Sequence, residues 1–276
     1  MSFVEAIVLG IVQGLTEFLP ISSTGHLVLA SWLLDWDDPG LELDVTVHAG
    51  TLAAVLLYFR REWAAMARGV LSGGAVTEPG PAGDSWNQRR MLVLLAIGTV
   101  PLGIVGLITY EQLGGGLRTP TSVGWLLMGT GVALAVGELF GRRLRRLGDL
   151  GVRDAGAVGL AQALAVLPGV SRSGVTIVAG LLGNMTRETA ARFSFLLATP
   201  AILGASVVQA GDWWVGRATA DLEWGPLAVA AVMSFVASLA AIRGLMTLLQ
   251  RGSLRPFVAY CLVAGAAVVA ARAAGL

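Results

Sequence analysis

Apolar residues fill most of the chain in long runs, and the lengths of these runs predict its elements. A helix that crosses the hydrocarbon core of a membrane needs about 20 mainly apolar residues. Runs of this kind predict an all-α integral membrane protein. The predicted spanning helices are 43–60, 90–110, 119–138, 190–211, 224–243 and 256–274.

Two further apolar regions, 4–34 and 155–185, are interrupted in the middle by short polar clusters. Each region is too short for two full spans and too interrupted for one. Broken segments of this kind are typical of re-entrant hairpins, in which a half-helix enters, the chain turns at depth, and a second half-helix returns to the same side.

The two interrupted regions resemble each other at an offset of 149 residues. The matched positions are Ala6, Gly10, Gln13, Leu15, Ser22, Gly25 and Ala30 with Ala155, Gly159, Gln162, Leu164, Ser171, Gly174 and Ala179. Three predicted spans follow each hairpin, so the second repeat enters the membrane from the opposite side. The sequence therefore predicts two inverted-topology repeats, 1–141 and 142–276, whose turns meet near the midplane of one membrane domain.

Composition supports a lipid environment and narrows the partners. Of the 276 residues, 55% are hydrophobic and 13% are charged, whereas a soluble domain carries about 25% charged residues. The net charge of +1 argues against nucleic acid as a partner. The one cysteine, Cys261, excludes an intramolecular disulfide framework and is interpreted as a packing residue.

The distribution of arginine predicts the orientation. In this layout 15 of the 19 basic residues, all of them Arg, fall on one side; Arg118, Arg217 and Arg272 fall on the other, and Arg172 lies within the membrane. The Arg-rich side is predicted to be cytoplasmic, which places both termini outside. The longest connection, 60–90, is predicted to be a flexible cytoplasmic loop.

The polar clusters, EFLPISSTGH (17–26) and PGVSRSG (168–174), have the composition of an anion site. Serine, threonine and glycine suit helix starts, and half-helices that begin near Ser23 and Ser173 would aim two positive dipole ends at one buried place. Arg172 adds a bidentate phosphate partner. The alternative is that Arg172 pairs with Glu17 only to hold the repeats together.

Residues near the first turn are candidates for the chemistry of this site. Glu17 could orient His26, take up a proton or bind a metal, and His26 could move protons near neutral pH. Ser23 is either a nucleophile or a plain helix cap. Asp44 and His48, one turn apart, are either a packed pair or functional.

A second group of residues is predicted to bind phosphate through hydroxyl, amide or backbone N–H groups. For Gln13 a helix-packing role is the alternative, and for the hydroxyl residues a capping role. The group comprises Gln13, Ser22, Thr24, Gly25, Ser171, Ser173, Gly174 and Thr176.

Four segments resemble the undecaprenyl-diphosphate phosphatase family, also called bacitracin resistance proteins, and the resemblance covers nearly the whole chain. They are QGLTEFLPISSTGH (13–26), LDVTVHAGTLAAVLLYF (43–59), PGVSRSG (168–174) and TRETAARFSFLLATPAILGA (186–205). The resemblance implies a bacterial plasma-membrane enzyme. It would remove the terminal phosphate of undecaprenyl diphosphate, recycle the lipid carrier for peptidoglycan synthesis and confer bacitracin resistance.

The resemblance also implies site residues and a cofactor. The motif positions fall on Glu17, Ser23, His26 and Arg172, with Gln13 where many members have a second Glu. In the predicted mechanism Ser23 attacks or positions a water, and His26, assisted by Glu17, handles the proton. The family implies a divalent cation, magnesium or calcium, shared with the diphosphate, and a site that opens to the outer face.

Two other classes of function remain in view. A polyprenyl-phosphate flippase or another inverted-repeat transporter would also need broken helices and a midplane anion site. A passive scaffold of a wall-synthesis complex would explain none of the polar residues. The sequence leaves open a homodimer, the prenyl chain length that is accepted, and whether lipid flipping accompanies catalysis.

Overall fold

The computed structural model describes residues 1–37, 40–71, 77–79, 85–109, 118–214 and 223–275. Helices dominate it, and two three-residue strands, β1 (Thr77–Pro79) and β2 (Ser85–Asn87), pair antiparallel. The helices are α1 (Phe3–Phe18), α2 (Ser23–Leu34), α3 (Gly40–Tyr58), α4 (Arg60–Leu71), α5 (Gln88–Thr109), α6 (Pro120–Phe140), α7 (Val152–Ala163), α8 (Arg172–Leu182), α9 (Arg187–Trp214), α10 (Trp224–Arg251) and α11 (Arg255–Ala273), with 3-10 turns at Leu147–Asp149 and Leu164–Val166.

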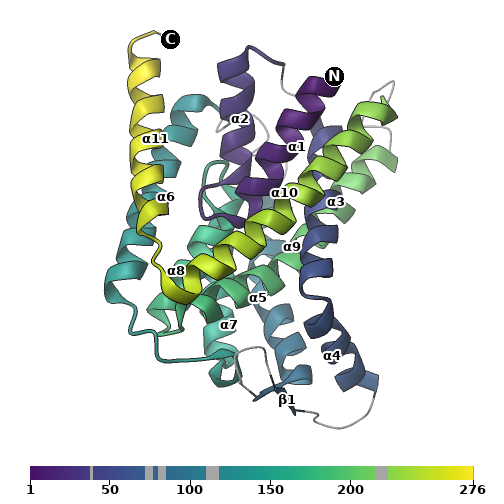
Figure 1. The fold of residues 1–276 in the computed structure, drawn as a ribbon, viewed down its shortest axis with the longest axis vertical. Helices are drawn as coiled ribbons and strands as arrows, with labels where there is room; N and C mark the ends of the chain where they lie inside the picture. Colours follow the sequence, from purple (N-terminus) through teal and green to yellow (C-terminus); the bar gives the residue numbers. More distant parts are fainter. Residues whose placement is uncertain (38–39, 72–76, 80–84, 110–117, 215–222, 276) are drawn as a thin grey trace.

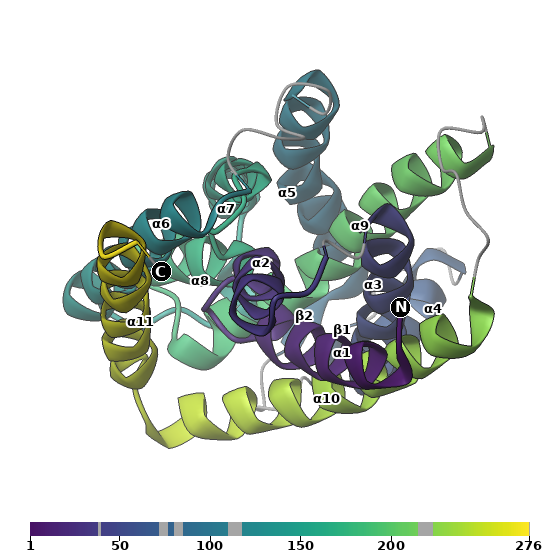
Figure 2. The same cartoon turned by 90° about the horizontal axis from the view of Figure 1, so that it is seen from above.

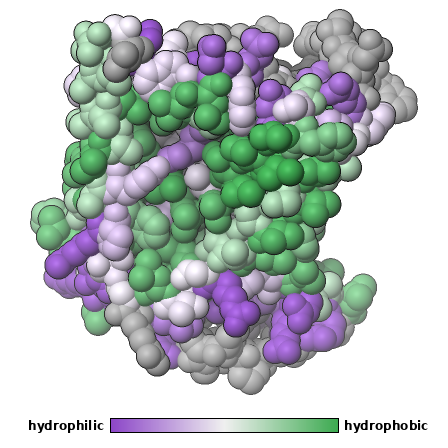
Figure 3. Space-filling view, turned by 45° about the horizontal axis from the view of Figure 1, so that its top comes forward, coloured by the Kyte–Doolittle hydropathy of each residue, from purple (hydrophilic) through white to green (hydrophobic). Residues whose placement is uncertain are grey.

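The predicted spans are present as helices. Among the described residues, five helices are long and apolar enough to cross a membrane, and a sixth is counted if α3 and α4, bent by 74° at their junction, form one span. Hydrophobic side chains form a broad band across the middle of the face in Figure 3, and hydrophilic side chains gather above and below this band. The fold is therefore that of an all-α multi-pass membrane protein, as predicted.

Both interrupted regions are helix–break–helix units. The pairs α1–α2 and α7–α8 each turn back inside the molecule, and α1 and α2 reach the end that carries both termini, whereas α7 lies toward the other end (Figure 1). The turns need left-handed backbone at Ser22 (φ 70°) and Gly169 (φ 107°). Glycine adopts this conformation readily, whereas at Ser22 it costs about 1–3 kcal/mol.

Two helix pairs approach at glycine. Helix α1 lies along α10 in Figure 2, and a Cβ on Gly10 would come within 2.5 Å of the carbonyl oxygen of Ala230. In the second hairpin, α7 packs on α5, and a Cβ on Gly159 would come within 2.6 Å of the carbonyl oxygen of Gly98. Since no side chain fits in either place, glycine sets the distance between the backbones of both pairs.

Two predictions about element boundaries were wrong. The predicted 60–90 loop begins with a helix, α4, because Glu62, Ala65, Met66 and Gly69 recur at helical spacing and form a buried face. The remainder of that loop includes β1, β2 and the start of α5, while residues 72–76 and 80–84 lie outside the described residues. Helix α10 continues past the predicted end at 243 to Arg251, inclined across the bundle (Figure 1).

Arginines at the end opposite the termini pair with carboxylates from other helices. Glu138 accepts hydrogen bonds from Arg187, and Arg192 Nη1 donates to Glu62 at 2.5 Å. Arg145 donates to both carboxylate oxygens of Asp154, at 2.6 and 2.7 Å. The first two pairs tie α9 to α6 and to α4, and the third ties the segment before α7 to α7 itself. Arg217, which was predicted on the termini side, lies outside the described residues.

Candidate active site

The two interrupted turns meet inside the bundle, as the sequence predicts. Ser173, at the start of α8, donates a hydrogen bond to the carbonyl oxygen of Leu19 in the first turn at 3.0 Å. The hydroxyls of Ser171 and Ser173 lie 3.1 Å apart. A side-chain hydroxyl thus joins the two turns directly, and the polar residues of both hairpins come together although they are about 150 positions apart in the chain.

A cavity of about 190 Å³ opens where the turns meet. Six of the predicted site residues line it, and they supply a carboxylate, a guanidinium and four hydroxyls. They are Glu17, Ser22, Ser23, Thr24, Ser171 and Arg172. The cavity therefore has the donor-rich lining that a phosphate group requires.

Glu17 is the centre of a hydrogen-bond network within this lining. Its Oε2 accepts from Ser23 Oγ at 2.5 Å and from Gln13 Nε2 at 3.0 Å, and its Oε1 accepts from Arg172 Nη2 at 2.7 Å. A serine hydroxyl bonded to a carboxylate that is fixed by two other donors is the arrangement of a nucleophile and its base. The network also includes the ion pair between Arg172 and Glu17, which the sequence offered as the alternative to an anion site.

Arg172 keeps part of its guanidinium free. The Arg172 and Glu17 side chains are only 12% and 6% exposed, so the ion pair is shielded from bulk water. Arg172 Nη1 is buried and has no hydrogen-bond partner among the described residues. A buried cationic donor without a partner is costly, and an anion in the cavity would satisfy it.

Both returning half-helices begin at this site. The hydroxyls of Ser22 and Ser171 cap α2 and α8 by accepting from the amides of Gly25 (3.3 Å) and Gly174 (3.1 Å). The first backbone bond of α2 runs from His26 N to Ser22 O. The backbone amides of the first two residues of each helix come before the first such bond, so they have no acceptor within the helix. The positive ends of both helix dipoles therefore lie at the cavity.

His26 does not pair with Glu17, which corrects the predicted assistance between them. Its Nδ1 lies 2.7 Å from the carbonyl oxygen of Ser22, and its Nε2 lies 2.6 Å from the hydroxyl of Tyr260 on α11. The side chain is not among those that line the cavity. His26 lies one turn into α2. Its ring contacts the carbonyl oxygen of Ser22, the residue with left-handed backbone in the turn.

Several predicted phosphate ligands do not line the cavity. Thr176 hydrogen-bonds to the Arg172 carbonyl at 2.7 Å and to the Ser194 hydroxyl at 2.6 Å, so its hydroxyl is used within α8 and against α9. Ser173 is used by the contact between the turns. The amides of Gly25 and Gly174 are used by the caps. These groups shape the site because local partners satisfy them.

Gln13 is fully buried beneath the site and does not line the cavity. Its Nε2 lies 3.0 Å from Glu17 Oε2 and 3.4 Å from His48 Nε2. These contacts hold Gln13 against Glu17 and His48, and the contact of Gln13 with phosphate stays a prediction.

The sequence leaves the role of His48 open and does not reveal the apolar wall of the cavity. His48 lines the cavity, as do Leu102, Ala165, Val170, Ala201, Ile202 and Ala205. Val170, Ala201, Ile202 and Ala205 fall in segments with a recognised motif, whereas Leu102 and Ala165 do not. Apolar residues in an apolar chain carry no signal that separates a cavity wall from a lipid-facing surface.

An apolar groove adjoins this wall between α5 and α9. It measures about 350 Å³ and shares Leu102, Ala201 and Ala205 with the polar cavity. A Cβ placed on Gly103, Gly106 or Gly204 would meet nothing within 4 Å, so these glycines leave the groove open. The polar cavity thus continues into a hydrocarbon-like channel.

The described residues do not form a resident divalent-cation site. They contain no group of three or more His, Cys, Asp or Glu side chains that could hold a metal. Both oxygens of Glu17 are engaged by protein donors, and Gln13 Oε1 is the one neighbouring acceptor in this network that is left without a partner among the described residues. Magnesium and calcium need more oxygen ligands than these supply.

Comparisons with known proteins agree with the geometry. The profile of the family described as bacitracin resistance protein BacA matches residues 6–267. The chain is 44% identical to an undecaprenyl-diphosphatase of Nitrosococcus oceani over 266 residues, which cover 96% of this chain and 97% of that protein. It is 41% identical to an undecaprenyl-diphosphatase of Alcanivorax borkumensis over 275 residues, covering 98% of each chain. It is 37% identical to an undecaprenyl-diphosphatase 2 of Streptomyces avermitilis over 287 aligned positions, covering 100% of this chain and 96% of the other.

Proposed function

The chain belongs to the bacitracin resistance protein BacA family, and we propose that it hydrolyses undecaprenyl diphosphate to undecaprenyl phosphate in the cavity between its two helical hairpins. The product is the lipid carrier for peptidoglycan synthesis, and removal of the diphosphate takes away the target of bacitracin. The observation that carries this proposal is the Ser23–Glu17–Arg172 network in a membrane-embedded cavity.

In the proposed reaction Ser23 Oγ attacks the terminal phosphorus, and its proton passes to Glu17 Oε2, 2.5 Å away. The bond between that phosphorus and the bridging oxygen breaks, so undecaprenyl phosphate leaves with the bridging oxygen. Glu17 passes this proton to the departing phosphate and is a base again. A water then attacks the phosphoserine and gives a proton to Glu17, the bond between Ser23 Oγ and phosphorus breaks, Ser23 Oγ takes the proton back from Glu17, and inorganic phosphate is released. One water is consumed for each diphosphate cleaved.

Arg172 and the two helix starts stabilise charge during the transfer. Nη2 is held by Glu17, which leaves Nη1 to bind a phosphoryl oxygen. The N-terminal amides of α2 and α8 add donors that are already oriented before the substrate arrives. Because phosphoryl transfer depends on positioning and charge neutralisation, a fixed guanidinium at this place favours catalysis over simple binding.

The prenyl chain would occupy the apolar groove between α5 and α9. The groove shares Leu102, Ala201 and Ala205 with the catalytic cavity, so a lipid tail in it would lead its head group directly to Ser23.

The divalent cation would enter with the diphosphate rather than reside in the empty protein. Bound to the phosphate oxygens, such an ion neutralises their charge. Gln13 Oε1 is the neighbouring oxygen with no other partner. Chelation with EDTA should therefore stop turnover without lowering the thermal unfolding temperature of the lipid-free protein, and added magnesium or calcium should restore turnover.

The proposed orientation places the Arg-rich end in the cytoplasm of a bacterial plasma membrane, with both termini and the site opening outside. The repeats 1–141 and 142–276 would have inverted topology. The matched glycine contacts of α1 with α10 and of α7 with α5 support this symmetry. In a Cys261→Ala background, an impermeant thiol reagent on intact cells should label Asp37→Cys and leave Arg142→Cys unlabelled until the cells are lysed; the reverse pattern would overturn the orientation.

The function is tested by phosphate release from C55 diphosphate by the purified protein in detergent, with magnesium, with calcium and with EDTA. Release that depends on the cation is expected. A folded protein that releases no phosphate with either ion would contradict the phosphatase and favour a lipid-phosphate transporter, which the same preparation tests in vesicles. Trapping of a phosphorylated Ser23 peptide would separate the nucleophile from an activated water.

The groove makes a prediction that depends on chain length. Gly103→Leu and Gly106→Leu should raise the KM for C55 diphosphate by about tenfold, because each added side chain occupies space that a tail would fill. The KM for a short, water-soluble prenyl diphosphate should change little. Gly129→Leu on α6 is the matched control, since a Cβ there also meets nothing within 4 Å but the residue lies outside the groove. Equal effects on long and short substrates would contradict this path for the tail.

A further inference from the structure

The imidazole of His48 is held in one orientation by the chain. Its Nδ1 lies 2.6 Å from the carbonyl oxygen of Asp44. A carbonyl oxygen can only accept, so Nδ1 carries the hydrogen. Nε2 then has a lone pair in the neutral ring, and this lone pair faces Gln13 at the edge of the catalytic cavity.

Gln13 links His48 to Glu17. Its amide nitrogen lies 3.0 Å from Glu17 Oε2 and 3.4 Å from His48 Nε2, and the direct distance between Glu17 Oε2 and His48 Nε2 is 3.9 Å. An amide nitrogen has two hydrogens, and both have an acceptor here. With the amide reversed, Gln13 Oε1 would oppose a carboxylate oxygen and a ring lone pair, so the two acceptors together fix its orientation.

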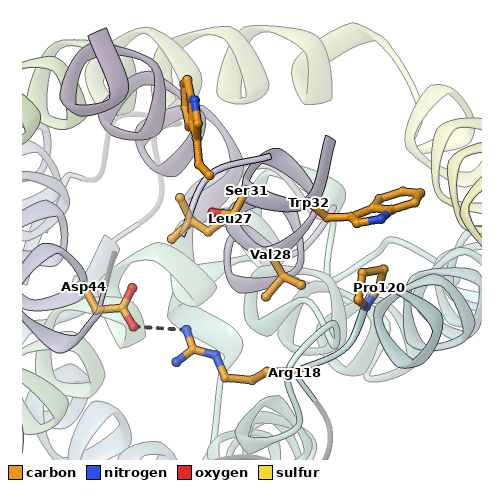
Figure 4. Close-up of a pocket in the computed structure, with 8 residues that line it drawn as sticks. Leu27, Val28, Ser31, Trp32, Asp44, Arg118 and Pro120 are labelled. Carbon is orange, nitrogen blue, oxygen red and sulfur yellow. Dashed lines mark hydrogen bonds and ion pairs between the residues drawn. The ribbon is translucent and has the colours of Figure 1, made fainter. Parts of the chain in front are cut away.

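The support for His48 extends outward from the catalytic cavity. Asp44, one turn earlier on α3, forms an ion pair with Arg118 Nη2 at 3.2 Å. Figure 4 shows this pair in direct contact at the wall of a pocket of about 250 Å³. Leu27, Val28 and Trp32 also line this pocket. The start of α3 is thereby held against the segment that leads into α6, and the Asp44 carbonyl that orients His48 is held with it.

We propose that His48 is a positioning residue: it accepts a hydrogen bond from Gln13 and so holds Gln13, and through it Glu17, in the orientation that receives the Ser23 proton. This inference rests on the proposed function, in which Glu17 is the base. The role requires an acceptor at the position of Nε2 and does not require that the imidazole itself exchange protons.

Loss of the acceptor should misplace the base without affecting the binding of the diphosphate. Without His48 Nε2, one hydrogen of a fully buried amide loses its partner, and Gln13 is expected to rotate to find another. Small displacements of a catalytic group cost up to about 100-fold in rate. The effect should therefore fall on kcat, while KM changes little because Arg172 and the helix starts remain in place.

The test compares His48→Leu with His48→Gln. The leucine removes the acceptor and should lower kcat about 10- to 100-fold, whereas the glutamine carries an amide oxygen that can accept from Gln13 and should restore most of kcat. Circular dichroism and thermal unfolding in detergent establish that each variant is folded. A His48→Leu enzyme with the parental kcat would overturn the proposal. Equal loss in both folded variants would also overturn it, since the imidazole itself would then be required.

A double-mutant cycle tests whether the effect passes through Gln13. If it does, His48→Leu should lower kcat no further in a Gln13→Leu background; a fully additive loss would contradict a route through Gln13. Gln162→Leu is the matched control, because Gln162 is the repeat counterpart of Gln13, is equally buried and does not line the cavity. An active Glu17→Gln enzyme would instead refute the assignment of Glu17 as the base, and a folded parent that releases no phosphate would refute the proposed function, so these failures are distinguishable from failure of the His48 proposal.

Discussion

Replacing Glu17 by glutamine is expected to lower kcat for phosphate release by about 10²- to 10⁴-fold, the range for loss of a general base. The amide keeps nearly the same shape and can still accept from Arg172, but it cannot take the proton of Ser23, whose hydroxyl is 2.5 Å away. KM should not rise, because the carboxylate repels the diphosphate. Steady-state phosphate release by the folded variant measures both constants.

Glu62→Gln provides the control for this variant. Glu62 is also a buried glutamate that accepts from an arginine, Arg192 at 2.5 Å, but it lies on α4 away from the cavity. Its replacement should lower thermal stability in detergent by an amount similar to Glu17→Gln and leave kcat per folded molecule unchanged. Parental kcat in a folded Glu17→Gln enzyme would falsify the assignment of Glu17 as the base.

Replacing Arg172 by alanine is expected to lower kcat/KM by about 10³- to 10⁵-fold, the range found for arginines that stabilise phosphoryl transfer. The variant loses the cation, the free Nη1 donor and the partner of Glu17 at the same time. It leaves the Glu17 carboxylate buried, which costs about 3–5 kcal/mol of stability when a buried partner is removed. Arg172→Lys should recover only a small part of the rate, since one ammonium cannot hold Glu17 and phosphate in a fixed plane.

Arg192→Ala is the control that separates the effect of Arg172→Ala on catalysis from its effect on stability. Arg192 and Arg172 have side chains that are each 12% exposed, and each pairs with a buried glutamate. Both alanine variants should unfold at lower temperature in detergent, whereas only Arg172→Ala should lose kcat/KM per folded molecule. Comparable activity losses in the two variants would assign the effect to folding rather than to the phosphoryl group.

Both variants act on contacts that join the two halves of the chain. Glu17 lies at the end of α1 and Arg172 at the start of α8, and the hydrogen bond from Ser173 to Leu19 fixes the two turns beside each other. The catalytic groups are therefore complete only when both hairpins are docked. This explains how a buried charge, which is costly in a membrane, can be retained at the site.

The sequence by itself determined the class of fold, most of the elements and most of the polar residues that line the cavity. Run length against membrane thickness gave the six spans, and interrupted runs gave the two hairpins, because unsatisfied backbone in lipid restricts the alternatives. Hydroxyl, glycine and arginine residues at the breaks located the anion site. Of the predicted residues, Glu17, Ser23 and Arg172 form its central network.

Only the tertiary structure decided which groups face one another. Sequence spacing places Glu17 near both Ser23 and His26, but the left-handed backbone at Ser22 and the reach of His26 to Tyr260 direct the carboxylate to Ser23. His48 joins the site because α3 packs beside α1, a contact that helical periodicity cannot reveal. Ser173 bonds to the Leu19 carbonyl of the other hairpin and Thr176 to the Arg172 carbonyl of its own helix, because buried hydroxyls are hydrogen-bonded to protein acceptors. Helical periodicity fixes which residues share a face; how the helices pack, and which rotamers result, fixes what each face meets.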